Sequence, residues 1–322
     1  MLRSTVDDCV EKNGMVKDDP MVCTAPFFSI VIAAYNDWDP LDQCLRSLRE
    51  QADGPTFEVI VVDDGSKEAA PESIRRWLDC YALKIVRQSH TGISAARNRG
   101  ARISTGTVLL FVDADCKLQT NCLAALASTV QAFSQHSAFQ LRLIADPCGL
   151  VGRAEELRLL TLQNHMLQPS GCIRYLNTAG FAIRRESMNR EDLFDPVARR
   201  AEDTLLLTEL MQDGELPLFV ADAVVQHAIP LSLMGWFFKT IRSAYLEAET
   251  YNIIGSKAAR FRVSHWERLT MLRSMWQTSE QDSIGRLAWF AVVARQSLRL
   301  IILSLAEASG TWSTSQRSAK HS

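Results

Sequence analysis

The chain has 322 residues, of which 47% are apolar and 22% are charged, with a formal net charge of −2 and a pI of about 6.3. These values are ordinary for a globular protein and exclude a disordered, collagen-like or polytopic membrane protein. The length suits about two domains, or one domain with an appendage, and the near-neutral charge gives no sign of a nucleic-acid partner.

Charge and tryptophan are concentrated toward the end of the chain. Residues 231–322 hold 12 Lys and Arg against 6 Asp and Glu, and five of the seven tryptophans. We therefore expect three parts: a flexible leader over residues 1–25, a main domain over 26–230, and a basic helical extension over 231–322.

Apolar and β-branched runs alternate with helical patterns along the main domain. The predicted strands are 28–34, 57–62, 83–87, 108–112 and 218–225, with a loop and then a strand over 171–183. The predicted helices are 41–48, 74–81, 94–104, 123–133, 155–166 and 204–211, with further helices beyond Pro230. This alternation predicts an α/β fold with a mostly parallel sheet flanked by helices, followed by the helical extension.

Polar clusters follow three of the predicted strands. They are Tyr35-Asn36-Asp37, Asp63-Asp64-Gly65-Ser66 and Asp113-Ala114-Asp115. Open α/β sheets bind ligands beyond the carboxyl ends of their strands, so we expect these clusters to border one site.

The Asp113-Ala114-Asp115 cluster places two carboxylates at alternate positions of an extended segment, where both can face one side. Hard oxygen donors of this kind suit Mg²⁺ or Mn²⁺ shared with substrate phosphates. A solvated turn is the alternative, but the position directly after a buried strand favours a metal site. His227, at the end of the last strand, could add a third ligand, although a lone histidine is more often structural.

Two other segments have both a structural and a functional interpretation. Asp63 and Asp64 either form a plain turn with Gly65 or accept hydrogen bonds from a nucleotide. The segment from His90 to Gly100 is either a surface helix with exposed arginines or a glycine-bearing loop whose Arg97 faces an anion.

Glu202 and Asp203 stand at the start of an apolar helix. Capping and a favourable interaction with the helix dipole would explain them, and so would a general base at the sheet end.

Together these segments resemble glycosyltransferase family 2 in order and spacing, over about residues 27–230. The resemblance rests on Ser29–Asn36 (SIVIAAYN), Val61–Ser66 (VVDDGS), Gly92–Gly100 (GISAARNRG), Phe111–Asp115 (FVDAD) and Glu202–Thr204 (EDT). It implies a GT-A, Rossmann-like fold and a nucleotide-diphosphate sugar as donor, with a UDP-sugar favoured.

The resemblance also implies roles for single residues. Ala34, Tyr35 and Asn36 would border the nucleotide, Asp63 or Asp64 would contact its base or ribose, and Arg97 would lie near the donor phosphates. Asp113 and Asp115 would hold ribose and a metal-bound diphosphate (Mn²⁺ or Mg²⁺), with His227 completing the metal site. Asp203, paired with Glu202, would be the catalytic base.

The reaction that follows is a metal-dependent, inverting transfer of one sugar to an acceptor hydroxyl, in the synthesis of a cell-surface polysaccharide or glycolipid. A single addition is favoured because the Q-x-x-R-W motif of processive synthases is absent. A nucleotidyltransferase and a non-catalytic sugar-nucleotide-binding scaffold are the alternatives. The acceptor would be a carbohydrate or a lipid-linked molecule.

The extension allows three interpretations. Residues 283–305 are apolar, but Arg286, Arg295 and Arg299 interrupt them, which argues against a membrane-spanning helix. Trp236 and Lys239 would suit an amphipathic helix at a membrane surface. The alternatives are a homodimer interface and packing on the main domain. Without an apolar leader at the N-terminus, we expect a cytoplasmic protein, either free or peripheral on the membrane.

Overall fold

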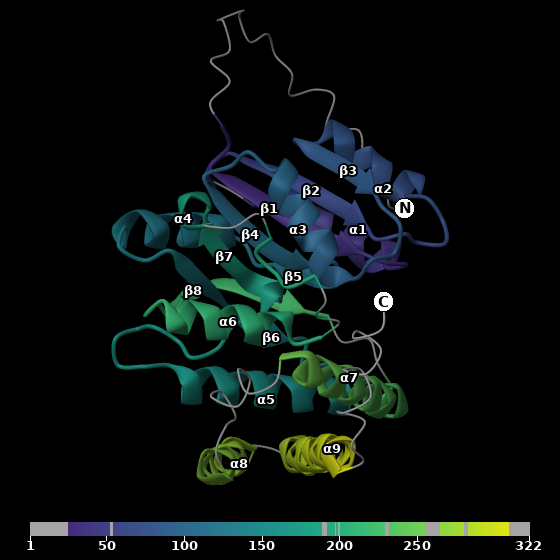
Figure 1. Ribbon diagram of the computed structural model, residues 1–322, viewed down its shortest axis with the longest axis vertical. Helices are drawn as coiled ribbons and strands as arrows, with labels where there is room; N and C mark the ends of the chain where they lie inside the picture. The colour runs from purple at the N-terminus through teal and green to yellow at the C-terminus, as the bar shows by residue number, and fades with distance from the viewer. Residues whose placement is uncertain are drawn as a thin grey trace, which may run out of the picture.

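The structure is a computed structural model that describes residues 25–51, 54–188, 192–196, 198, 200–228, 232–254, 265–279 and 283–308. Nearly all of the predicted leader lies outside the described residues. Strands, helices and the C-terminal extension occur in the predicted order (Figure 1).

In the described part of the chain, eight strands form one sheet. They are β1 (Phe28–Ala34), β2 (Phe57–Asp63), β3 (Leu83–Arg87), β4 (Val108–Asp113), β5 (Cys116–Leu118), β6 (Ala138–Ala145), β7 (Phe181–Arg184) and β8 (Leu218–His227). Their spatial order is β3-β2-β1-β4-β7-β6-β8-β5. The first four pair in parallel, whereas β7 is antiparallel to both neighbours and β5 is antiparallel to β8.

Helices cover the sheet and extend below it in Figure 1. They are α1 (Trp38–Arg49), α2 (Glu72–Arg75), α3 (Ile93–Ile103), α4 (Cys122–Ala132), α5 (Gly149–Met166), α6 (Glu202–Gln212), α7 (Leu233–Ile254), α8 (His265–Ser279) and α9 (Ser283–Ala308). Short 3₁₀ turns occupy Arg76–Asp79, Thr178–Gly180 and Arg185–Ser187. The α/β fold class is confirmed.

The central strands are mostly apolar because both faces of the sheet are covered. In β1, for example, Phe28, Ile30, Val31 and Ile32 are fully buried. Helix α3 approaches β1 very closely: a Cβ built on Gly100 would lie 2.3 Å from Cγ1 of Val31. This contact fixes the position of the helix that carries Arg97.

The structure differs from the predicted elements at several points. Strands β5 and β6 were not predicted, α5 begins six residues before its predicted start, and the helix expected over 74–81 is one α-helical turn followed by a 3₁₀ turn. Helix α1 begins at Trp38, three residues before its predicted start, with Asp37 at the N-cap position.

In Figure 1, α8 and α9 lie on the far side of α5 from the sheet, whereas α7 lies beside α5. A buried apolar cluster holds this layer together and comprises Val151, Ala154, Leu157, Trp236, Met275, Ala288 and Val292. The expectation that Trp236 lies at a membrane surface is wrong, because its side chain is 2% exposed and its indole N–H donates to Glu155 at 2.8 Å.

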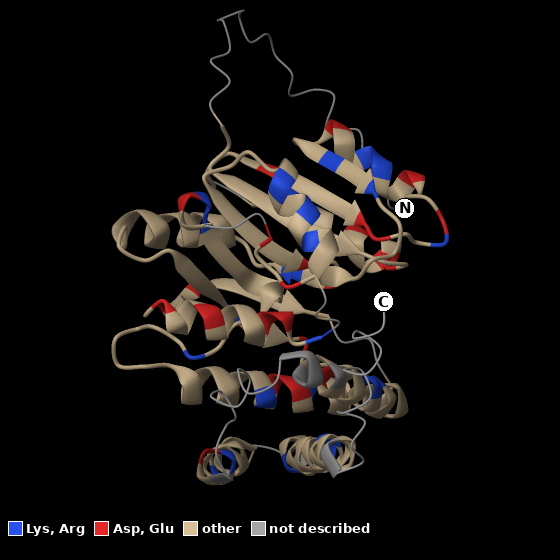
Figure 2. Cartoon of the chain, viewed as in Figure 1, with Lys and Arg blue, Asp and Glu red and all other residues tan. Residues whose placement is uncertain are grey.

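Helix α9 is long and apolar enough over Ile284–Ala306 to cross a membrane by length and composition, and only 11% of its apolar window is buried. Two of the arginines that argue against a span, Arg295 and Arg299, form ion pairs with Glu155 and Glu247. Figure 2 shows Lys or Arg on both α8 and α9.

Candidate active site

The three predicted polar clusters meet at one edge of the sheet. In the parallel register Ala34 lies beside Asp63, and Ala33 lies beside Asp113. The carboxyl ends of β1, β2 and β4 are therefore neighbours, as the sequence predicts.

Backbone and side-chain contacts tie the first two clusters together. Asn36 has a left-handed backbone conformation, with φ of 58°, which asparagine adopts more readily than most residues. Its N–H donates to Oγ of Ser66 at 2.9 Å, and its side-chain oxygen accepts from the N–H of Lys67 at 2.8 Å. These bonds hold the loop after β1 against the loop after β2.

Asp63 and Asp64 are buried and bonded within the protein. Asp63 accepts from the N–H of Ser66 at 2.8 Å. Asp64 accepts from the N–H groups of Thr91 and Gly92 at 3.0 and 2.9 Å, and its second oxygen lies 2.8 Å from Nδ1 of His90. Asp63 therefore fixes the turn after β2, and Asp64 fixes the loop that precedes α3.

Tyr35 and His90 form an exposed aromatic pair beside this loop. Their rings stack with centroids 4.3 Å apart, and Tyr35 is 41% exposed. Ala34 lies beneath, with its carbonyl accepting from the N–H of Asp64 at 2.9 Å. A flat aromatic surface at a sheet end can receive the face of a nucleotide base.

Arg97 lies at the centre of a buried ionic group. One terminal nitrogen contacts Asp113 and the other contacts Glu202, both at 2.6 Å, and its guanidinium lies 5.7 Å from the ring centre of Phe194. The residue is only 1% exposed, so the structure places Arg97 between the β4 end and the start of α6.

This group sets the charge of Asp113. Burial would raise the pKa of its carboxyl, but Arg97 and His227 hold that pKa below its usual value. Asp113 therefore stays ionised while one of its oxygens contacts Arg97.

Asp115 and His227 lie together where β5 pairs with β8. Nε2 of the histidine is 3.3 Å from Oδ2 of Asp115, and the carbonyl of Asp115 accepts from the N–H of Ala228 at 2.9 Å. Burial and the neighbouring Asp113 raise the pKa of Asp115, although His227 opposes this. A carboxylate oxygen and an imidazole nitrogen at this separation fit Mn²⁺ or Mg²⁺.

Cys116 completes this group in space, and the sequence did not single it out. Ligand atoms of Asp115, Cys116 and His227 all lie within 4.8 Å of one another. Burial raises the pKa of the Cys116 thiol well above its usual value, which leaves it protonated and a poor ligand for a hard cation. Asp113, which we expected among the ligands, is not in this group.

Glu202 and Asp203 begin α6 and differ in environment. Glu202 is buried against Arg97. Burial and the adjacent Glu202 raise the pKa of Asp203 to about 7, and Asp203 accepts from the N–H of Thr204 at 2.7 Å. A carboxylate that titrates near neutral pH is suited to general base catalysis.

Helix α7 also contributes charge to this site. Burial and Asp115 raise the pKa of Asp37, whereas Lys239 lowers it, and the same lysine lowers the pKa of Asp115. Lys239 therefore lies near the Asp115–His227 pair. Its position could not be inferred from sequence, because α7 begins outside the segment that carries the motifs.

Comparison with known proteins gives the family of this chain. The sequence model of the family described as glycosyl transferase family 2 matches residues 29–193. The glycosyltransferase AglE of Haloferax volcanii is 34% identical over 113 residues, which cover 34% of this chain and 37% of AglE. A validoxylamine A glucosyltransferase of Streptomyces hygroscopicus subsp. limoneus is 38% identical over 91 residues, covering 27% of this chain and 20% of that protein. The chain thus matches well under half the length of these relatives.

Solved structures share the fold. The mannosyltransferase PcManGT of Pyrobaculum calidifontis, solved with GDP-Man and Mn²⁺, has a TM-score of 0.57 at 20% identity, covering 94% of this chain and 85% of its own. Residues 1–349 of TarS from S. aureus, solved with UDP, have a TM-score of 0.53 at 16% identity, covering 88% and 90%. With its family match over half of the chain and the GT-A fold around the matched motifs, the protein belongs to glycosyl transferase family 2.

Proposed function

We propose that the protein transfers one sugar from a nucleotide-diphosphate sugar to an acceptor hydroxyl, with inversion at the anomeric carbon. The observation that carries the proposal is a single ionic group: Arg97 contacts both Asp113 of the D-x-D segment and Glu202, the neighbour of Asp203. One guanidinium therefore joins the D-x-D segment to the start of α6, where the pKa of Asp203 is raised to about 7.

The donor would be bound at the ends of β1, β2 and β4. Tyr35 is exposed there, while Asn36, Asp63 and Asp64 shape the surrounding loops. Similarity to PcManGT, whose structure contains GDP-Man and Mn²⁺, and to TarS, whose structure contains UDP, supports a nucleotide donor. A UDP-sugar is the donor to test first.

Asp115 and His227 would hold the divalent cation. When bound, the cation would stabilise negative charge on the diphosphate. Arg97 would keep Asp113 ionised beside that site instead of contacting the phosphates itself, because both ends of its guanidinium are engaged by carboxylates.

Asp203 would act as the base. It would take the proton of the acceptor hydroxyl as the oxygen bonds to the anomeric carbon. The bond from that carbon to the diphosphate oxygen would break in the same step, and the nucleoside diphosphate would leave. Attack opposite the leaving group gives inverted configuration.

The C-terminal helices would bring the protein to a membrane surface, where a lipid-linked acceptor for polysaccharide or glycolipid synthesis would be reached. Large apolar side chains exposed on α9 support this role: Ile284, Leu287, Phe290, Ile301 and Leu305. Cationic and aromatic residues of the same layer suit an anionic lipid interface. A homodimer through this face is the second candidate.

A product assay tests the proposal. Incubation with UDP-sugars and GDP-sugars, Mn²⁺ and a lipid-phosphate acceptor should release free nucleoside diphosphate together with a glycosylated product. Release of pyrophosphate would instead indicate a nucleotidyltransferase. Nucleotide binding without either product, across a broad panel of acceptors, would favour the scaffold.

A further inference from the structure

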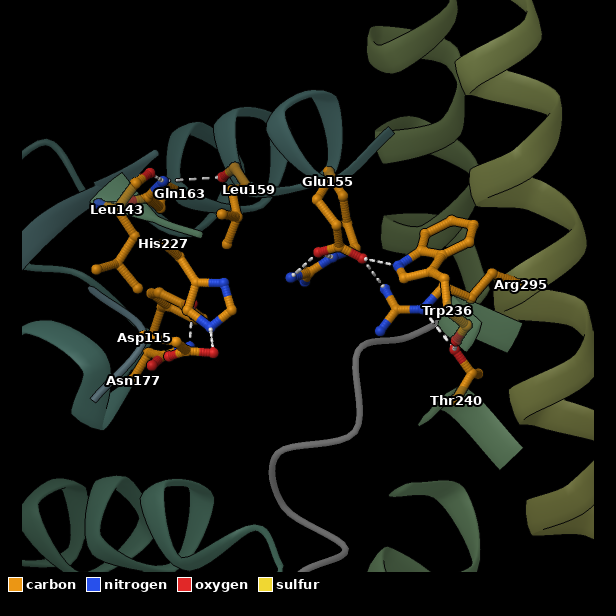
Figure 3. A network of polar contacts seen from close by, with 12 residues as sticks. Asp115, Leu143, Glu155, Leu159, Gln163, Asn177, His227, Trp236, Thr240 and Arg295 are labelled. Carbon is orange, nitrogen blue, oxygen red and sulfur yellow. Dashed lines mark hydrogen bonds and ion pairs between the residues drawn. The ribbon is translucent and has the colours of Figure 1, made fainter. Parts of the chain in front are cut away.

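Two arginines from different helices share one buried carboxylate beside the active site. Arg158 of α5 contacts Oε2 of Glu155 at 2.7 Å, and Arg295 of α9 contacts Oε1 at 2.6 Å. Trp236 donates to the same Oε1 at 2.8 Å, and Arg295 also donates to Thr240 at 2.8 Å. Figure 3 shows Arg295, Trp236 and Thr240 gathered around Glu155.

The charges of this group do not balance. Glu155 is the one carboxylate that contacts either arginine among the residues the structure describes, and its other partner, Trp236, is neutral. The next arginine along α9, Arg299, has a carboxylate of its own in Glu247. Two guanidinium groups on one carboxylate leave a net positive charge.

That charge is present at neutral pH. Burial would raise the pKa of Glu155, but Arg158 and Arg295 lower it to about 2, so the carboxyl is ionised. Burial and the nearby Arg158, Arg299 and Arg200 lower the pKa of Arg295 to about 10, although Glu155 opposes the change. Both arginines therefore remain protonated.

The group is partly accessible. The side chains of Arg158 and Arg295 are 21% and 23% exposed, whereas that of Glu155 is only 7% exposed. The two arginine side chains are thus more exposed than the carboxylate that they share. Buried or half-buried charges are normally paired, so an unbalanced pair of this kind is suited to an anionic ligand.

The group lies on the side of the site where the base is found. Arg200 is close enough to Asp203 to lower its pKa and close enough to Arg295 to lower that of the guanidinium. Burial and Asp203 raise the pKa of Tyr175, whereas Arg158 lowers it. The hydroxyl of Tyr175 accepts from the side-chain amide of Asn177 at 3.0 Å. Arg200 and Tyr175 therefore lie near both the Glu155 group and Asp203.

We propose that Arg158 and Arg295, held by Glu155, form a subsite for a phosphate group on the acceptor. The proposal rests on the proposed glycosyltransferase function and deepens it, since it gives the acceptor a chemical class. Guanidinium groups bind phosphate through paired N–H donors in a fixed planar arrangement, so two of them can engage one phosphate together. The donor diphosphate is the other possible source of the same chemistry, and the test separates the two.

The test is a calorimetric titration of inorganic phosphate into the full-length protein already saturated with UDP or GDP and Mg²⁺. Wild type should bind phosphate saturably with the nucleotide present. Arg158→Gln and Arg295→Gln should each weaken phosphate binding about tenfold, the loss expected for charge-assisted hydrogen bonds. Glu155→Gln should strengthen it, because the change removes the competing carboxylate.

Arg299→Gln is the matched control. It removes the same charge from α9, but from a guanidinium that is balanced by Glu247, so phosphate affinity should stay within about twofold of wild type. Circular dichroism would check the fold of each variant. If a glutamine variant is unfolded, Arg295→Lys, which keeps the charge but loses the planar donor pair, should bind phosphate with intermediate affinity.

Three results would overturn the subsite. They are no saturable phosphate binding by wild type, equal losses in Arg295→Gln and Arg299→Gln, or phosphate binding that disappears when the nucleotide is bound. The last would assign the phosphate to the donor site. Failure of the proposed function would look different, because nucleotide binding itself would then be absent from the same experiment.

Discussion

Arg97, Asp113 and Glu202 form one buried group, and each carboxylate contacts the same guanidinium at 2.6 Å. The sequence identified all three as site residues, because each belongs to one of the segments that resemble the family motifs. It could not reveal their pairing, because Arg97 and Glu202 are 105 residues apart in the chain. The contact of Arg97 with donor phosphates therefore stays a prediction from family resemblance, and the structure favours a positioning role.

Replacing Arg97 tests which of these roles it has. Arg97→Met should lower the free energy of unfolding by about 3–5 kcal/mol, because two carboxylates would be left buried without a counter-charge. Urea denaturation measures this loss. A stable variant with weakened nucleotide affinity would instead support direct contact with the donor.

Asp203 gives the site its expected pH dependence. A base whose pKa lies near 7 must lose its proton before it can accept another, so wild-type turnover should rise with pH through about 7. Asp203→Asn should reduce kcat by about 10²–10⁴-fold and leave nucleotide affinity near that of wild type. Steady-state kinetics over pH 5–9, roughly spanning the titration, would measure both effects.

The same carboxyl makes a prediction about stability. Its folded-state pKa is raised, so the folded protein holds a proton that the unfolded chain releases, and stability declines as pH rises from about 4 to about 7. At pH 8 the free energy of unfolding of Asp203→Asn should therefore exceed that of wild type by on the order of 1 kcal/mol, and this difference should shrink at lower pH. Thermal unfolding at several pH values would measure it. Asp213→Asn, an exposed aspartate at the other end of α6, is the control and should show no such trend.

At the scale of elements, sequence periodicity identified the first four parallel strands and their helices. It missed β6 because Gln140 and Arg142 interrupt the apolar run, yet Gln140 is fully buried and bonded to Gly180 and Asn177. It missed β5 because three residues are too few to show a period. Tertiary pairing, rather than local pattern, determines both strands.

The close contact of α3 with β1 should be sensitive to one methyl group. Gly100→Ala would place its Cβ against Val31 and should destabilise the protein by about 1–3 kcal/mol, with a loss of activity because Arg97 lies on the same helix. Adding Val31→Ala, which removes the methyl groups that clash, should restore part of the stability. Equal stability of the single variant and wild type would contradict the close packing.

The outer face of α9 makes a prediction about membranes. Leu287 and Phe290 are 59% and 57% exposed, so Leu287→Glu and Phe290→Glu should preserve the fold and abolish sedimentation with anionic vesicles. Leu78→Glu, at a leucine 47% exposed in the main domain, is the matched control and should sediment like wild type. A wild-type protein that is a stable dimer and ignores vesicles would favour the dimer interface.

At the scale of the whole molecule, the extension is joined to the main domain through buried apolar and ionic contacts. Trp236, Ala288 and Val292 pack on α5, and Glu155 links α5 to both α7 and α9. The change in composition near residue 230 predicted a domain boundary there. Charge and tryptophan content do not show which helices share a buried core, and the helices on both sides of residue 230 share one here. A separate role for residues 231–322 stays a prediction.

The family and fold could be read from motif order because parallel strands end at the same edge of a sheet, which brings separated short motifs together. Side-chain partners could not be read in this way, as Asp113 shows: its sequence position suits a metal ligand, yet one oxygen contacts Arg97. Lys239 and Arg295 reach the site region from helices that carry no motif.

In the proposed function, one edge of the sheet binds a nucleotide diphosphate together with a metal held by Asp115 and His227. The measurement to make is calorimetric titration of UDP, GDP and dTDP, with and without Mn²⁺, into wild type and Asp115→Ala. We expect binding of one nucleotide that requires Mn²⁺ and is lost in a folded Asp115→Ala protein. Binding that is indifferent to Mn²⁺ and to Asp115, or no binding of any of the nucleotides by folded wild type, would contradict it.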